Sequence, residues 1–262
     1  MPDGPVWLTG VLAGVLAALA GAAIGSFIGT ALVRLPADRS ILKGRSACDA
    51  CGVGIGARDL VPLWSWLALR GRCRACGAGI GAWQPGCEVA GAVIGAAAVV
   101  FAPQGLALPA MLLGWQLLLL GVIDVRHLWL PRSLVAVLAA SGLAFVMLHS
   151  WQAASLLPLT NALAGGALGF AMLWGVARGY QLVRGRDGMG DGDPPLLGAV
   201  GIWVGPMGMI GSVIGASILG LAAALVMLLA RRPVAADTAL PLGTLLAVAG
   251  WVIFLATGWG WP

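Results

Sequence analysis

Long apolar runs, several near the roughly 20 residues that a helix needs to cross a bilayer, dominate this chain. Hydrophobic residues make up 60% of its 262 residues and charged residues only 10%, which leaves too little polar surface for a soluble fold. The runs predict an all-α polytopic membrane protein with about eight transmembrane helices, two of them short. They cover residues 7–35, 87–101, 106–123, 130–148, 159–176, 195–204, 207–230 and 240–259.

The 15 basic residues occur only in every second connection between these runs. Because Lys and Arg near span ends stay in the cytoplasm, we predict cytoplasmic polar loops and both termini outside. The first run has no basic residue before Arg34, so we expect a retained helix and not a cleaved signal peptide. The formal net charge of +5 then reflects orientation and contact with anionic lipid, not nucleic-acid binding. The basic residues are Arg34, Arg39, Lys43, Arg45, Arg58, Arg70, Arg72, Arg74, Arg126, Arg132, Arg178, Arg184, Arg186, Arg231 and Arg232.

Glycines recur at spacings of three and four within the runs, as at residues 21, 25 and 29, at 91 and 95, and at 165 and 169. Small residues at this spacing let transmembrane helices approach closely. We therefore predict a packing role for them and no chemical one.

Two C-x-x-C pairs, Cys48 with Cys51 and Cys73 with Cys76, lie in the long cytoplasmic loop. Four thiolates at this spacing can hold one tetrahedral Zn²⁺, and a closed sphere of four thiolates indicates a structural metal. A reducing cytoplasm disfavours disulfides, and a redox pair would need a βαβ context. Cys87 has no partner in the pattern and is expected to be a buried apolar residue.

Two aspartates, Asp124 and Asp193, fall at the predicted cytoplasmic ends of apolar runs, at the same depth on the same side. Neighbouring carboxylates share a proton, so one can act as general base on a water while the other protonates a scissile carbonyl. Asp187 and Asp191 lie nearby, and we expect them only to solvate the loop. Two overlapping G-x-G-D patterns end at Asp191 and Asp193.

The order of these segments resembles the type IV prepilin peptidases, which are bacterial membrane aspartyl proteases with a G-x-G-D motif. The match downstream of the second pattern favours Asp193 over Asp191. The chain departs from that family at Gly29, Gln84, Arg132 and Pro195. The similar segments are residues 25–28 with 34–36, the two cysteine pairs with 62–67 and 69–73, Pro85 with Glu88, residues 123–124 with 130–131, and residues 188–193 with 196–197 and 201–205.

The resemblance implies three regions: a first transmembrane helix (1–35), a cytoplasmic zinc-ribbon-like loop domain (36–88) and a membrane aspartyl peptidase core (89–262). It implies cleavage of prepilins or type II secretion pseudopilins by Asp124 and Asp193 at the cytoplasmic face of the bacterial inner membrane. Many family members also methylate the new N-terminus with S-adenosylmethionine. Gly71, Arg72 and Glu88, beside the cysteine pairs in sequence, are the expected site for that donor.

Two other functions remain open from the sequence. The chain is compatible with a non-catalytic assembly protein of a secretion or pilus system, with Pro195 where the family commonly has lysine. Paired carboxylates and glycine-rich helices also suit a proton-coupled transporter. Transport is disfavoured because both aspartates are predicted at one face and no internal repeat is evident.

Overall fold

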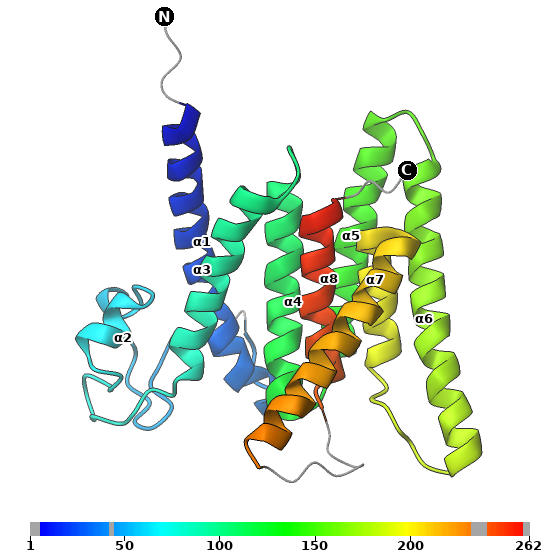
Figure 1. Cartoon of the computed structure of the whole chain (residues 1–262). Helices are drawn as coiled ribbons and strands as arrows, with labels where there is room; N and C mark the ends of the chain where they lie inside the picture. The colour runs from blue at the N-terminus through cyan, green and yellow to red at the C-terminus, as the bar shows by residue number, and fades with distance from the viewer. Residues whose placement is uncertain (1–5, 42–44, 232–239, 259–262) are drawn as a thin grey trace, which may run out of the picture. The chain divides into compact units, whose positions relative to one another are not determined.

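The computed structural model describes residues 6–41, 45–231 and 240–258, which form helices joined by loops (Figure 1). Two compact units divide the chain, Met1–Phe101 and Ala102–Pro262. Some sequence predictions concern residues outside the described ranges. They are the orienting roles of Lys43 and Arg232, the end of the last run at residue 259 and the external C-terminus. The limits of the three regions expected from the resemblance remain a prediction.

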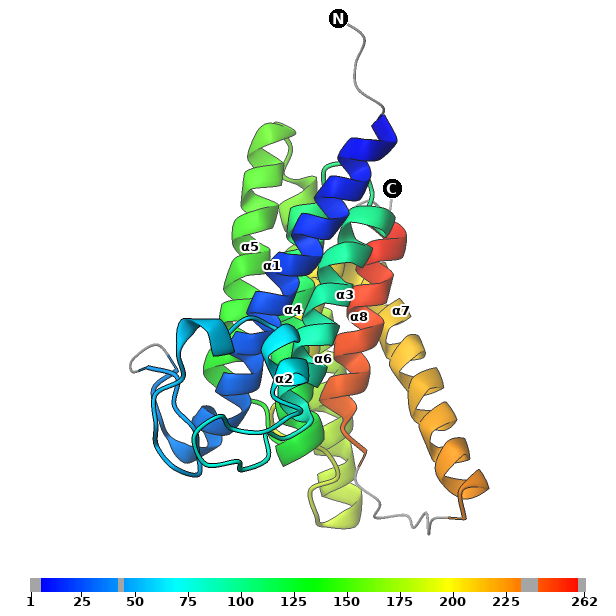
Figure 2. The same ribbon diagram turned by 90° about the vertical axis from the view of Figure 1, so that its left-hand side faces the viewer.

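In the first unit, α1 (Val6–Arg34) and α3 (Trp83–Phe101) run side by side (Figure 2). A Cβ atom at Gly21 would collide with the backbone of Gly91, and one at Gly25 with the backbone of Cys87. The predicted packing role of these glycines is therefore confirmed, because no larger residue fits at the crossing. The loop between the two helices carries η1 (Leu35–Ala37), η2 (Ala57–Asp59) and the short helix α2 (Trp64–Ala68).

The second unit consists of five helices around one buried aromatic cluster. Trp203 is fully buried, donates a hydrogen bond from Nε1 to the Leu138 carbonyl at 2.9 Å, and stacks on Phe145 at 5.5 Å between ring centroids. The edge of Phe254 meets the same indole at 5.9 Å. Because these side chains come from three helices, the cluster joins them into one core. The helices are α4 (Ala107–His127), α5 (Arg132–Gln152), α6 (Leu157–Arg184), α7 (Asp193–Leu229) and α8 (Leu242–Thr257).

α7 is broken at Gly205, whose φ of 69° and ψ of −178° are not helical. Pro206 follows and cannot donate a backbone hydrogen bond, so the helix cannot continue regularly through this pair. Figure 1 shows the chain turning back here: the yellow first part rises to the break and the orange second part descends from it. The break coincides with the connection predicted at Gly205–Pro206.

The number of spans differs from the prediction. In the described part of the chain, six helices are long and apolar enough to cross a membrane, namely α1 and α3 to α7. The two runs predicted at 195–204 and 207–230 correspond to the parts of α7 before and after the break at Gly205, and α8 has only 16 residues. A count of eight is therefore not confirmed, because hydropathy alone does not show whether a broken apolar run makes one spanning element or two. The all-α class is confirmed, with only isolated β-bridges among the described residues.

We expect Gly165→Ala to destabilise the second unit by about 1–3 kcal/mol, the usual cost of overpacking a close contact. A Cβ at Gly165 would collide with the carbonyl oxygen of Gly201 and crowd the backbone of Gly205, and neither can move aside as a side chain would. Gly175→Ala is the matched control on α6, since nothing lies within 4 Å of its added Cβ. Thermal unfolding in detergent should separate the two variants, and equal melting temperatures would contradict the packing role.

Candidate active site and zinc cluster

The four cysteines of the two C-x-x-C pairs converge in the first unit. The Sγ atoms of Cys48, Cys51, Cys73 and Cys76 all lie within 4.8 Å of one another, and those of Cys48 and Cys76 are 3.9 Å apart. Tetrahedral zinc with Zn–S bonds of about 2.3 Å requires S···S separations near 3.8 Å. The thiols therefore fit a four-thiolate site, as the spacing predicted. Cys87 is buried in α3 and stands outside the cluster.

Each pair is shaped by the same local turn. The N–H of Gly52 donates to the Cys48 carbonyl at 2.8 Å, and the N–H of Gly77 donates to the Cys73 carbonyl at 2.9 Å. Both glycines have positive φ, 70° and 72°, which residues with a side chain rarely adopt. The glycine after each C-x-x-C therefore lets the backbone fold back so that both thiols face one point.

Polar contacts around the cluster reinforce it. The N–H groups of Cys76 and Ala75 and the thiol of Cys48 lower the pKa of the Cys73 thiol to about 7. The N–H of Ala78 lowers the pKa of Cys76, but the Cys51 thiol and the other thiols raise it overall to about 11, so Cys73 is the first of these two thiols to ionise. Arg74 donates to both oxygens of Asp59, at 2.7 and 2.9 Å, and so holds the pKa of Asp59 below its usual value. This ion pair ties η2 to the second cysteine turn.

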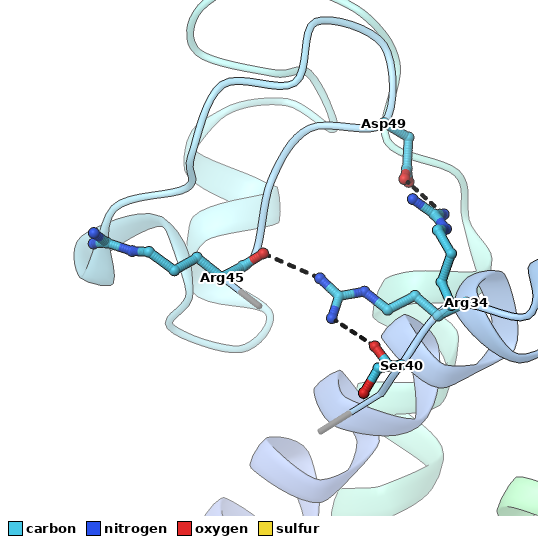
Figure 3. A network of polar contacts seen from close by, with 5 residues as sticks. Arg34, Ser40, Arg45 and Asp49 are labelled. Carbon is cyan, nitrogen blue, oxygen red and sulfur yellow. Dashed lines mark hydrogen bonds and ion pairs between the residues drawn. The ribbon is translucent and has the colours of Figure 1, made fainter. Parts of the chain in front are cut away.

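Arg34, at the end of α1, joins that helix to the cysteine loop. Its guanidinium donates to the carbonyls of Ser40 at 3.3 Å and Arg45 at 3.1 Å (Figure 3). Arg39 pairs with Asp49, inside the first C-x-x-C, at 3.4 Å. The sequence identified these arginines only as signals of orientation, and their loop contacts were missed because each partner is a backbone oxygen or an exposed carboxylate.

Glu88 is buried where α3 meets the loop domain. Its Oε2 accepts the N–H of Leu63 at 2.7 Å, and its Oε1 accepts Nε2 of Gln84 at 3.2 Å. Leu63 has a positive φ of 61°, so the carboxylate holds a strained turn immediately before α2. Gln84 also reaches Ser26 on α1, and Gly29 leaves room for it: a Cβ at Gly29 would lie 2.5 Å from Gln84 Oε1. The departures from the family at Gly29 and Gln84 thus meet in space.

The residues expected to hold the methyl donor have different surroundings. Gly71 is buried at a φ of 67° against the ring of Trp66, whereas Arg72 is exposed. Among the described residues no hydrogen bond or ion pair joins Gly71, Arg72 and Glu88. Their role toward S-adenosylmethionine stays a prediction.

The two predicted catalytic aspartates lie at the same end of the second unit. Asp124 is in the last turn of α4 and Asp193 is the first residue of α7, and both side chains are buried, 5% and 6% exposed. Oδ2 of Asp124 accepts two hydrogen bonds from Thr244 on α8, one from its N–H at 2.8 Å and one from its hydroxyl at 3.0 Å. A buried carboxylate at the end of a membrane helix lowers stability unless it is hydrogen-bonded, and otherwise it indicates a functional role.

Leu130 and two glycines bring the aspartates together. Gly192 lies against Leu130, because an added Cβ at Gly192 would be 2.5 Å from Cβ of Leu130. Gly243 lies against both Leu130 and Asp124, because an added Cβ there would be 2.9 Å from Leu130 Cδ1 and 3.0 Å from Asp124 Oδ2. Leu130 therefore lies between Gly192, which precedes Asp193, and Gly243, which lies beside Asp124. The two carboxylates are close enough for the charge of Asp124 to act on Asp193. Such a pair can share one proton.

The other two acidic residues of this loop are exposed. Asp187 accepts a hydrogen bond from Gln181 at 3.1 Å, and Asp191 lies at the surface. Their exposure supports the choice of Asp193, which remains a prediction. Pro195 lies in the first turn of α7, where a missing N–H leaves no helical hydrogen bond unmade.

Two family models match the chain: the Bacterial Peptidase A24 N-terminal domain over residues 19–102, and the Type IV leader peptidase family over residues 111–225. A prepilin leader peptidase/N-methyltransferase of Aeromonas hydrophila is 35% identical over 84% of this chain and 73% of that protein. Proteins with the same description from Stutzerimonas stutzeri and Pseudomonas aeruginosa are 36% and 35% identical, over 82% and 86% of this chain and 72% and 74% of their own lengths. No solved structure matches the chain.

Proposed function

Because the chain belongs to the type IV leader peptidase family, we propose that Asp124 and Asp193 are the catalytic dyad of a membrane aspartic endopeptidase. Its substrates are prepilins or type II secretion pseudopilins, in keeping with the relatives named prepilin leader peptidase. The observation that carries the proposal is the burial of both carboxylates at the same end of the second unit, where the charge of Asp124 acts on Asp193. If these aspartates only solvated a loop, both side chains would be exposed to water.

The dyad performs hydrolysis with one shared proton. The ionised carboxylate takes a proton from a water molecule as the water oxygen bonds to the scissile carbonyl carbon, while the other carboxyl gives its proton to the carbonyl oxygen. In the second step the amide nitrogen receives a proton from the dyad and the C–N bond breaks. The leader leaves with a new carboxylate and the mature pilin with a new amino group.

The chain is a multi-pass inner-membrane protein, and we place its active end at the cytoplasmic face. α4 ends and α7 begins at the lower end of the second unit in Figure 1. Arg126, Arg132 and Arg184 lie in the turns of α4, α5 and α6 at that end. Basic residues at span ends remain cytoplasmic, so the dyad faces the side where a basic prepilin leader is made.

The experiment uses a synthetic peptide that carries a basic prepilin leader and the start of the following apolar segment. Inverted membrane vesicles, which expose the cytoplasmic face, should cleave this peptide without detergent. Right-side-out vesicles should cleave it only after solubilisation, and mass spectrometry should locate the cut at the end of the leader. Cleavage by right-side-out vesicles would reverse the proposed face, and no cleavage by solubilised protein would favour the non-catalytic assembly protein.

The second activity is methylation of the new N-terminus, as the names of the relatives suggest. With S-adenosylmethionine present, the mature product should be heavier by one methyl group. Arg72, which is exposed, would bind the donor's carboxylate, and Glu88 would orient the amine. Arg72→Ala and Glu88→Gln should lower methylation and leave cleavage largely intact. Because Glu88 also supports the turn at Leu63, Arg72→Ala is the cleaner variant, and an unmethylated wild-type product would leave a peptidase alone.

Zinc, if bound, would be held by Cys48, Cys51, Cys73 and Cys76, which occupy all four tetrahedral positions. A closed sphere leaves no site for water or substrate. The metal would therefore order the loop domain and take no part in hydrolysis.

A further inference from the structure

Thr244, near the start of α8, makes the closest polar contacts to Asp124, and no sequence pattern marked it. We propose that Thr244 is a positioning residue that holds Asp124 as the ionised, proton-accepting member of the dyad. The inference rests on the proposed function of Asp124 and Asp193, and it assigns the base and the acid that the dyad alone leaves unassigned.

Both donors of Thr244 converge on one oxygen of Asp124. The backbone N–H lies 2.8 Å and the hydroxyl oxygen 3.0 Å from Oδ2, while Oδ1 stands outside these two bonds. Two donors on a carboxylate oxygen favour its ionised form and fix the plane of the group. Asp124 can therefore present Oδ1 to a water molecule in one orientation.

The hydroxyl of Thr244 has two acceptors and one proton. Its Oγ1 lies 2.9 Å from the Gly121 carbonyl, one turn earlier on α4, and 3.0 Å from Asp124 Oδ2. With Asp124 ionised, the hydroxyl donates to Oδ2. After Oδ1 of Asp124 has taken the proton of the attacking water, Oδ2 is the carbonyl oxygen of the neutral carboxyl group. It still accepts from the backbone N–H of Thr244, and the hydroxyl can donate either to Oδ2 or to the Gly121 carbonyl. Thr244 keeps its own proton throughout, so a buried carboxyl stays bonded in both states.

Asp193 has no comparable support. Within the described residues no side chain donates a hydrogen bond to its carboxyl group, and only the backbone N–H of Gly190 faces it. A carboxyl with fewer donors holds the shared proton more readily. Asp193 is thus the general acid that protonates the carbonyl, and Asp124 is the general base.

The test compares Thr244→Val, which keeps the backbone donor and the shape but removes the hydroxyl, with Thr244→Ser, which retains the hydroxyl. Thr244→Val should lower kcat for the leader peptide about 10- to 100-fold, the value of one hydrogen bond to a charged group. KM should change little, because the bond acts on Asp124 and not on bound peptide. Thr244→Ser should restore most of kcat. Thr257→Val is the matched control on the same helix, since its hydroxyl bonds only backbone carbonyls, and it should retain wild-type kcat.

A kcat for Thr244→Val equal to that of Thr257→Val would overturn the inference, as would equal losses in the Val and Ser variants. If Thr244→Val does not accumulate in the membrane, Thr244→Ala against Thr244→Ser gives the same comparison without added bulk. In an Asp124→Asn background Thr244→Val should cause no further loss, because the two groups act as a unit. Retained cleavage by Asp124→Asn itself would refute the dyad, whatever Thr244 does.

Discussion

Asp124→Asn and Asp193→Asn should each lower the rate of prepilin cleavage by about 10²- to 10⁴-fold, the range for loss of a general acid or base. Asparagine keeps the shape of the side chain but cannot take or give the proton. Both side chains are buried, so water cannot substitute freely for either. The measurement is kcat/KM for the leader peptide, made with purified variants whose melting temperatures match the wild type.

Asp191→Asn and Asp187→Asn are the matched controls from the same loop, and both should cleave at close to the wild-type rate. Their side chains are exposed, and Asp187 already bonds Gln181. Activity in Asp193→Asn together with inactivity in Asp191→Asn would show that the other G-x-G-D pattern supplies the catalytic residue. If none of the four variants loses activity, the protease proposal fails.

The second large effect should come from the cysteine cluster. Purified protein is expected to contain one zinc per chain, and replacing Cys48, Cys51, Cys73 or Cys76 with serine should abolish its binding. Structural zinc sites bind with about 10–16 kcal/mol, which is also folding energy for the loop that forms them. The loop domain should then become sensitive to protease, whereas the helices of the second unit should keep their thermal transition.

Cys87→Ser is the control, since Cys87 is buried in α3 outside the cluster and its loss should leave the zinc content unchanged. Elemental analysis measures the zinc content, and alkylation measures how many cysteine thiols are free to react. Protein without zinc, with all four cluster thiols freely alkylated, would contradict the metal site.

Local patterns predicted the parts of the site whose partners are close in the chain. The C-x-x-C-G turns are determined within a few residues by glycines at positive φ, so sequence alone predicted the convergence of the four thiols. The position of Asp193 at the start of α7 also follows a local pattern, the second G-x-G-D. The order of such segments indicated the family, and the family models and relatives confirm it.

Hydropathy predicted the fold class correctly but did not determine the number of transmembrane helices. The apolar runs predicted an all-α membrane protein because hydrocarbon requires each backbone polar group to be bonded within a helix. The same runs placed a connection at Gly205–Pro206, where α7 breaks and the chain turns back (Figure 1), but they did not show whether the two parts of α7 each cross the membrane. Nor did they show that α8 would be short.

The sequence by itself determined membrane helices, a thiolate cluster and two aspartates at comparable depth, because apolar length, C-x-x-C spacing and helix ends are properties of neighbouring residues. Only the tertiary structure decided what surrounds those groups. Thr244 lies 120 residues from Asp124 in an ordinary apolar run, and Glu88 bonds the amide of Leu63 from 25 residues away. A hydrogen bond between distant segments leaves no periodic trace, since it depends on helix packing, which is set by small residues such as Gly243 and Gly192 at the contacts.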